Sequence, residues 1–318
     1  MNPIRSIIHA ARVFAWRRRH ADYAAIFNWH QVSPDFEPAR HHRYIWTEFD
    51  LFCEEVEAIA QEFEIVPLHE LIARLRAGKL HGALAALTFD DGDASVADYV
   101  LPFLASKSIP ATFFINSAYV EQPRTYWFPV LAYLAHDADA RMRAGLAEVP
   151  EALSRRIRTT SDPAVYNSLR EEVENLVSIV PQLKERVVTR NWLANLDPAQ
   201  FSIGAHGHEH QRFSMMSLDW QSHDLKRNLD ELGSYPAFRP IFAVPFGRSG
   251  DWNADTVRIA RSMGFDVVFA AGGLNLPLSG ELRRIPSDGA NLRPLLRANI
   301  LNEARIAREA RRDDRARQ

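Results

Sequence analysis

The 318-residue sequence has a single cysteine, Cys53, which excludes an intramolecular disulfide and any cysteine-rich zinc module. The net charge is also small: 38 lysines and arginines against 40 acidic residues give a net charge of −2. A dedicated nucleic-acid-binding protein is strongly basic. No apolar run reaches the ~18 residues that a transmembrane helix needs. Residues 1–19 lack the small-residue cleavage site of a signal peptide. We therefore expect a cytoplasmic protein with no nucleic-acid partner.

Apolar runs and helical periodicity alternate along the chain. Short apolar runs typical of buried strands lie at 24–29, 84–89, 111–115, 201–204, 241–244 and 266–269, with a weaker one at 64–66. Helical periodicity lies between them, at 49–63, 68–75, 95–106, 219–232 and 254–263. This order predicts βαβ units and a parallel sheet, hence an α/β fold. About seven such units favour a closed barrel over an open sheet.

Residues 121–197 interrupt this alternation. The segment is charge-rich, has helical periodicity at 139–158 and 165–180, and shows no strand. We interpret it as a helical insertion in one connection of a barrel that spans residues 21–296. A separate small helical domain is the alternative.

The two ends of the chain are basic. Residues 1–20 are predicted to form an amphipathic helix, and residues 297–318 a charged helix or tail. Residues 1–19 carry five arginines and no acidic residue, so one interpretation is peripheral contact with the inner face of a membrane. The other is that the apolar stripe of this helix packs on its own domain.

Two adjacent carboxylates give the strongest chemical signal. The apolar run at 84–87 is followed by Thr88-Phe89-Asp90-Asp91-Gly92. Because side chains alternate along a strand, the two acids point in different directions, so one can bind a metal while the other stays free as a base. Gly92 lets the chain turn behind them. The alternative is a plain strand-to-helix turn in which an aspartate caps the next helix, but Asp93 or Ser95 is available for that cap.

Three histidines in five residues form the second signal. The run at 201–204 is followed by His206-Gly207-His208-Glu209-His210. Residues four apart share one face of a helical turn, so His206 and His210 are predicted to bind one ion together. Two histidines and a carboxylate make a three-ligand site that leaves a position open, as a catalytic metal requires, and zinc fits these ligands best.

Two weaker signals occupy equivalent places. Pro245-Phe246-Gly247 closes the run at 241–244, and His30 follows the first predicted strand. Taken alone, the first is a turn and the second a structural histidine. Both nevertheless lie just past the carboxyl end of a predicted strand, as the aspartates and the histidine pair do. In a parallel barrel these ends form one face, and that face carries the active site.

Together these motifs resemble those of the polysaccharide deacetylase (NodB-homology) family of carbohydrate esterases, from residue 30 to residue 287 apart from the insertion. Residues 88–92 reproduce the family's TFDDG motif. Residues 206–210 match its second motif, and 243–247 its third. The resemblance implies a distorted (β/α) barrel and metal-dependent removal of an N-acetyl, or sometimes O-acetyl, group from a sugar.

The resemblance also implies roles for single residues. Asp90 is the general base, and the divalent metal is bound by Asp91, His206 and His210. The backbone N–H of Phe246 helps to hold the oxyanion.

The sequence departs from the family pattern in two places. Many members have an arginine where Ala243 stands, and this arginine orients the base. The late motif that supplies a catalytic histidine is also absent, because residues 282–286 contain none. A subset similar to poly-N-acetylglucosamine deacetylases instead has an early Tyr-His-x-Val motif, which Trp29-His30-Gln31-Val32 resembles. We therefore take His30 as the candidate general acid.

The expected function is a metal-dependent deacetylase. Its partner is an N-acetylated sugar in a polysaccharide, an oligosaccharide or a glycan precursor. One alternative is a metal-dependent hydrolase of a non-sugar amide. The other is a weakly active or non-catalytic glycan-binding barrel, because the family's arginine and late histidine are missing.

Overall fold

The computed structural model describes residues 22–37, 45–121, 125–143, 145, 150–179, 187–270, 272–278 and 280–287. The terminal helices predicted for residues 1–20 and 297–318 lie outside these described residues. Within them, no helix has both the length and the apolar character needed to cross a bilayer.

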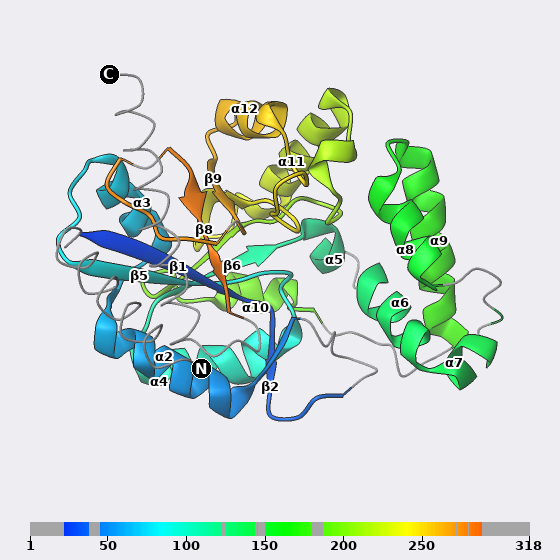
Figure 1. Ribbon diagram of the computed structural model, residues 1–318, viewed down its shortest axis with the longest axis horizontal. Helices are drawn as coiled ribbons and strands as arrows, with labels where there is room; N and C mark the ends of the chain where they lie inside the picture. Colours follow the sequence, from blue (N-terminus) through cyan, green and yellow to red (C-terminus); the bar gives the residue numbers. More distant parts are fainter. Residues whose placement is uncertain are drawn as a thin grey trace, which may run out of the picture.

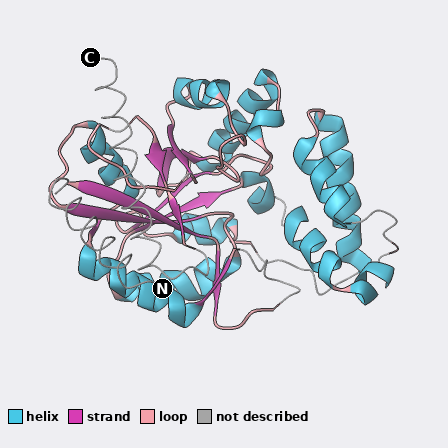
Figure 2. Ribbon diagram, viewed as in Figure 1, coloured by secondary structure: helices cyan, strands magenta, loops and turns pink. Residues whose placement is uncertain are grey.

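Parallel strands form the centre of the molecule, and helices surround them (Figures 1 and 2). The strands are β1 (Tyr23–Trp29), β2 (Gln31–Ser33), β3 (Trp46–Glu48), β4 (Glu64–Ile65), β5 (Ala83–Phe89), β6 (Ala111–Ile115), β7 (Phe201–Ala205), β8 (Phe238–Ala243), β9 (Asp266–Phe269), β10 (Leu282–Arg283) and β11 (Ile285–Pro286). The helices around the sheet are α2 (Phe49–Glu62), α3 (Leu68–Arg76), the π-helical turn η1 (Val96–Val100), α4 (Leu101–Ser106), the 3-10 turn η3 (Phe213–Met215), α11 (Leu218–Leu232) and α12 (Ala254–Ser262).

The main sheet is a nearly closed barrel. Its strand order is β10-β9-β8-β7-β6-β5-β1-β11, with β4 also paired to β5, and every pairing among the described strands is parallel. Only Arg284 separates β10 from β11, although these strands stand at opposite ends of that order. The predicted distorted (β/α) barrel is therefore confirmed. The described sheet has nine strands rather than about seven. The two additional strands are β10 and β11 at the ends of the strand order, where the barrel has its seam, and each has only two residues, too few to give a periodicity.

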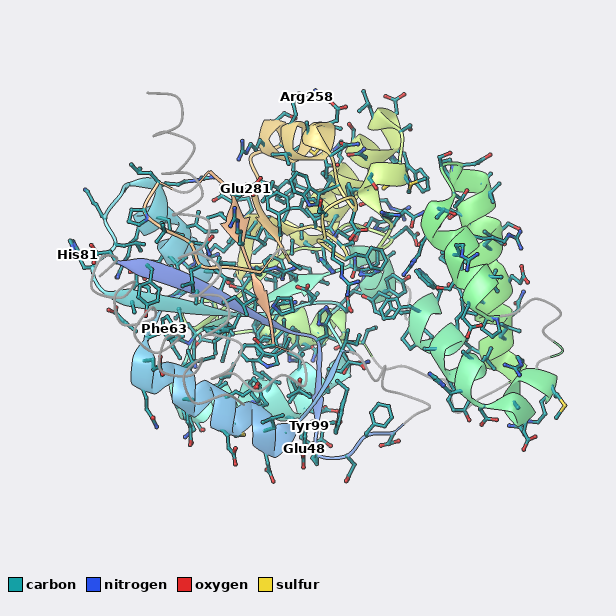
Figure 3. The ribbon with its side chains drawn as sticks, in the orientation of Figure 1. Glu48, Phe63, His81, Tyr99, Arg258 and Glu281 are labelled. Atoms are coloured by element: carbon teal, nitrogen blue, oxygen red, sulfur yellow. The ribbon has the colours of Figure 1, made fainter. Side chains whose placement is uncertain are left out.

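The central strands β1, β5, β6 and β7 are buried on both faces, as expected of a parallel sheet covered by helices. Aromatic side chains anchor the first two long strands: Trp29 of β1 stacks on Phe89 of β5, with ring centroids 5.7 Å apart, and meets Phe52 of α2 edge-on at 5.5 Å. The buried indole N–H of Trp29 donates to Glu55 Oε2 at 3.1 Å, so this polar atom is not stranded in the core. Side chains fill the space between the sheet and its helices, and the labelled Arg258 and Tyr99 lie at the periphery (Figure 3).

The insertion between β6 and β7 is helical. It contains α5 (Ser117–Glu121), α6 (Trp127–His136), α7 (Ala138–Arg143), α8 (Pro150–Thr159), α9 (Pro163–Ile179) and α10 (Arg190–Asn195). Helices α6 to α9 form a bundle beside the barrel (Figure 1) around their own apolar cluster, against which Phe246 and Trp220 pack. The helical pattern at 139–158 is two helices, because Gly145 takes a left-handed φ of +60° and α8 starts afresh at Pro150.

Register brings the ends of four strands together. Trp29 pairs with Phe89, so His30 and Asp90 are the next residues on neighbouring strands, and the Asp90 N–H donates to Trp29 O at 2.9 Å. Ile115 pairs with Ala205, and the His206 N–H donates to Ile115 O at 3.1 Å. The carboxyl ends of β1, β5, β6 and β7 therefore open onto the same face of the barrel.

Candidate metal centre and active site

Asp91 stands on a sharp turn directly after β5. It has a left-handed φ of +69°, and Gly92 follows with +65°. A Cβ on Gly92 would lie 3.0 Å from Ile115 Cδ1, so both the φ and the space favour glycine there. The local turn is satisfied by Asp93, whose Oδ1 accepts the Ser95 N–H at 2.8 Å. Asp93, and neither Asp90 nor Asp91, therefore accepts this backbone N–H after the strand.

The histidine pair meets through a loop and not through a helical turn, so that part of the prediction was wrong. Residues 206–210 form no helix: Gly207 has a φ of +76° and His210 one of +53°. A Cβ on Gly207 would be 3.0 Å from Asp224 Oδ1, which explains the glycine. Asp224 holds this loop by accepting the backbone N–H groups of His208 and Glu209 at 2.7 and 3.2 Å. These bonds to the loop backbone replace the hydrogen bonds that a helix would have made.

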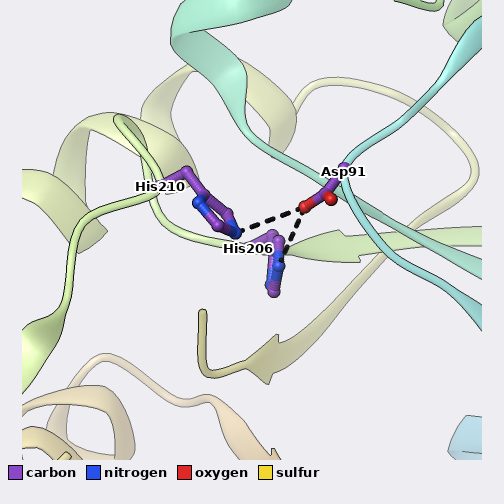
Figure 4. A group of neighbouring side chains, drawn as sticks. All are labelled: Asp91, His206 and His210. Carbon is purple, nitrogen blue, oxygen red and sulfur yellow. Dashed lines mark ion pairs between the residues drawn. The ribbon is translucent and has the colours of Figure 1, made fainter. Parts of the chain in front are cut away.

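Asp91, His206 and His210 nevertheless form a compact buried cluster (Figure 4). One potential ligand atom from each lies within 4.8 Å of the others. Asp91 Oδ1 is 3.3 Å from Nε2 of both histidines. Burial opposes the Asp91 carboxylate, but the two histidines outweigh it and lower the pKa of Asp91. Burial lowers the pKa of His210 to about 4, so this imidazole is neutral at neutral pH, as a metal ligand must be.

The atoms of this cluster fit a cation. His206 Nδ1 lies 2.8 Å from Ala243 O, and because a carbonyl only accepts, Nδ1 carries a proton, which leaves Nε2 as the nitrogen that can bind a metal in the neutral imidazole. Among the described residues, no hydrogen-bond donor satisfies the buried Asp91 Oδ1. A carboxylate oxygen and imidazole lone pairs that face one another in a buried space need a positive charge between them. A divalent ion such as zinc meets that need.

Asp90 is held by Arg284. The guanidinium donates to both carboxylate oxygens, Nη1 to Oδ1 at 2.6 Å and Nη2 to Oδ2 at 2.9 Å. Asn28 of β1 adds its Nδ2 donor to Oδ2 at 3.2 Å. Burial works against the Asp90 carboxylate, but the charge of Arg284 and of the neighbouring histidines outweighs it and holds the pKa of Asp90 well below its ordinary value. Asp90 is therefore a carboxylate at neutral pH.

His30 faces the same carboxylate. Its Nε2 lies 3.7 Å from Asp90 Oδ2, and 19% of its side chain is exposed, against 4% for Asp90. His206 Nε2 approaches Asp90 Oδ2 from the metal cluster at 3.9 Å. His30 and the cluster therefore flank one carboxylate, and His30 keeps contact with solvent.

Aromatic rings enclose His210 on the side of the insertion. Phe246, with a left-handed φ of +61°, places its ring centroid 4.8 Å from that of His210. Tyr126 and Phe128 approach the same imidazole at 5.7 and 5.3 Å. Phe246 thus lies beside the cluster of Asp91, His206 and His210, while the predicted role of its backbone N–H stays a prediction.

A cavity of about 430 Å³ lies between the insertion and the barrel. Tyr166 of α9, Glu209 of the histidine loop and Trp220 of α11 contribute to its lining, and the three cluster residues do not. The cavity is thus distinct from the metal cluster, although the same loop borders both.

Sequence reasoning missed three polar residues of the site. Asn28 and Arg284 bind Asp90, and Tyr126 bonds to the turn that carries Asp91. The signal for Asn28 was a polar residue inside an otherwise apolar run. Nothing local marks Arg284 or Tyr126, because each reaches the site only through the closure of the barrel or the path of the insertion.

Comparison with known families bears directly on these motifs. Residues 77–268 match the family model for polysaccharide deacetylase, and this span contains both aspartates, the histidine pair and Phe246. The chain belongs to the polysaccharide deacetylase family. It is therefore a hydrolase of carbon–nitrogen bonds, and the predicted family is confirmed. No curated protein matches the sequence at a significant level.

Solved structures of deacetylases share this fold. The chain is similar to Streptococcus pyogenes deacetylase PplD (15% identity, TM-score 0.55), covering 87% of this chain and 98% of that one. IcaB from Ammonifex degensii has 17% identity and a TM-score of 0.53, with 88% and 98% covered. A de-N-acetylase from Aggregatibacter actinomycetemcomitans has 15% identity and a TM-score of 0.54, with 85% and 97% covered. At such low identities the likeness shows the fold alone, and the roles of single residues rest on the geometry.

Proposed function

We propose that the protein is a metal-dependent deacetylase that hydrolyses the N-acetyl group of a sugar. The observation that carries this proposal is the pairing of a three-ligand cluster with a separate carboxylate: Asp91 faces the two histidines, and Asp90 is held beside them by Arg284. A base that stays free of the metal and three ligands that leave a position open are what hydrolysis of an amide requires.

The metal, for which we propose zinc, is held by Asp91, His206 and His210. When bound, it supplies a Lewis acid for the acetamide carbonyl and makes water more acidic. The other steps belong to the protein's own side chains.

Asp90 accepts a proton from the attacking water while the oxygen of that water bonds to the acetyl carbon. Because Arg284 and Asn28 hold both carboxylate oxygens, the base is oriented before the substrate arrives. The backbone N–H of Phe246 donates to the oxyanion that develops, a contribution of ~3 kcal/mol for one donor in comparable sites. His30 protonates the nitrogen as the carbon–nitrogen bond breaks, and acetate and a free amino sugar leave.

The substrate is proposed to be an N-acetylated sugar in a polysaccharide, an oligosaccharide or a glycan precursor. Support for this substrate class comes from the match to the polysaccharide deacetylase family. The alternative of a non-catalytic barrel rested on the missing arginine at position 243 and on the missing late histidine. Arg284 meets the first objection because its guanidinium binds the proposed base, and His30 is our candidate for the role of the missing histidine.

Acetate release from N-acetylglucosamine oligomers tests the proposal, and acetate release from non-sugar N-acetylated amides is measured for comparison. Asp90→Asn is expected to abolish release, while Asp255→Asn, on the exposed face of α12, is expected to leave it unchanged. Equal rates on non-sugar amides would contradict the sugar specificity. Full activity of Asp90→Asn would contradict the mechanism.

A further inference from the structure

Both ends of the helical insertion contact the turn that carries Asp91. At the entry, the Tyr126 O–H donates to Asp91 O at 2.6 Å. At the exit, the Val188 N–H donates to Gly92 O at 2.8 Å, and Val187 forms an antiparallel bridge with Asp93. Two consecutive carbonyls of the turn are thus held by residues 62 positions apart in the chain. The insertion is joined to the proposed metal centre as well as to the barrel.

Asn116 extends this contact to the histidine loop. Its Nδ2 faces two carbonyls, those of His206 and Gly207, the latter at 3.2 Å. Because carbonyls only accept, this atom is the amide nitrogen, and Oδ1 is the atom that lies 2.9 Å from the Tyr126 hydroxyl. Asn116 Oδ1 and Asp91 O are both acceptors, so they share the single hydroxyl proton of Tyr126. Tyr126 and Asn116 therefore link the backbone of the carboxylate ligand to that of the two imidazole ligands.

The local backbone requires such support. Asp91 adopts a left-handed φ of +69° and His210 one of +53°, conformations that residues with a Cβ keep only when their surroundings impose them. Tyr126 is fully buried, and its ring stacks on Tyr119 with centroids 3.8 Å apart. Its hydroxyl is therefore fixed in place, and the buried Asp91 carbonyl would lose a donor without it.

We propose that the insertion clamps the Asp91–Gly92 turn and that Tyr126 is a positioning residue of the metal centre, acting through its hydroxyl. This inference rests on the metal centre of the proposed function. It assigns the insertion a role in setting the affinity of the centre for its ion, beyond forming a wall beside it. Partners that orient metal ligands in this way change metal affinity by about 10- to 100-fold when they are removed.

The test compares Tyr126→Phe with Tyr133→Phe. The first removes only the hydroxyl that binds Asp91. The second removes the hydroxyl of Tyr133 on α6 of the same insertion, which donates to Asp137 Oδ2 at 2.8 Å. The dissociation constant for Zn²⁺ is measured by competition with a chelating dye, and the absorption spectrum of the Co²⁺-loaded protein reports the ligand geometry. Tyr126→Phe is expected to weaken Zn²⁺ binding at least 10-fold and to alter the spectrum, while Tyr133→Phe changes neither.

A second variant covers a failure of Tyr126→Phe to fold. Asn116→Asp keeps an acceptor for Tyr126 but turns an oxygen toward the carbonyls of the histidine loop, and it is expected to weaken Zn²⁺ binding as well. A wild-type protein that binds Zn²⁺, with Tyr126→Phe or Asn116→Asp binding it equally well, would overturn the clamp alone. A wild-type protein that binds no metal would overturn the metal centre itself and this inference with it.

Discussion

Arg284, which lies between β10 and β11, forms a bidentate, buried ion pair with Asp90 at the end of β5. Two N–H···O contacts of 2.6 and 2.9 Å join them, although 194 positions separate them in the sequence. Arg284 is the single residue between β10 and β11, so the pairing of β11 with β1, and of β1 with β5, brings its side chain to Asp90. Ala243, where the resemblance leads one to expect an arginine, instead offers its carbonyl to His206 Nδ1.

Replacing Arg284 should impair catalysis more than metal binding. Arg284→Met removes both donors from Asp90, and kcat is expected to fall about 100-fold because the base loses its orientation. Arg284→Lys restores a charge but not the two-pronged contact, so only part of the rate should return. Acetate release and metal content are measured together, with Arg283→Lys as a control on the half-exposed neighbour. An unchanged kcat in Arg284→Met would refute the positioning role.

His30→Gln tests the general acid. The imidazole stands 3.7 Å from Asp90, and its loss is expected to lower kcat by about 10²- to 10⁴-fold while the metal is retained. A general acid must be protonated to act, so the kcat of the wild type should fall toward alkaline pH. This fall should be smaller in the variant. His81→Gln, at an exposed position, serves as the matched control. An alkaline limb that persists in His30→Gln would assign the acid to another group.

Asp224 makes stability depend on pH. Burial raises the pKa of this carboxyl from 3.8 to about 7, against the two backbone N–H bonds that it accepts. The folded state therefore holds a proton that the unfolded chain releases near pH 4. The contribution of Asp224 to the free energy of unfolding should therefore fall as pH rises from about 4 to 7 and level off above that.

Urea unfolding of the wild type and of Asp224→Asn at several pH values isolates this effect. The stability of the wild type relative to the variant should decrease between pH 5 and 7. Asp230→Asn, on an exposed position of the same helix, should show no such trend. A difference between wild type and Asp224→Asn that stays constant, or grows with pH, would show that Asp224 ionises normally.

The sequence was sufficient to predict that candidate site residues which directly follow a strand lie close together. Asp90 and Asp91 follow a buried run, and so do His206 and His30, and parallel strands bring such ends to one face. The helical turn expected for the histidine pair was wrong, because Gly207 and Asp224 shape a loop there instead.

The residues that could not be predicted reach the site from segments that are distant in the sequence. Arg284 sits between two-residue strands whose pairing shows only in three dimensions, and Tyr126 reaches Asp91 through the path of the insertion. Both residues satisfy groups of the site from segments that carry no motif of their own. Local periodicity contains no information about such contacts.

Acetate release from N-acetylglucosamine oligomers tests metal-dependent deacetylation most directly when one preparation is followed in three states: as purified, after removal of metal by a chelator, and after reloading with Zn²⁺. The protein should release acetate and free amine in equal amounts, lose both activities on stripping, and recover them on reloading. Full activity of the stripped protein, or no acetate in any state, would contradict the proposed function.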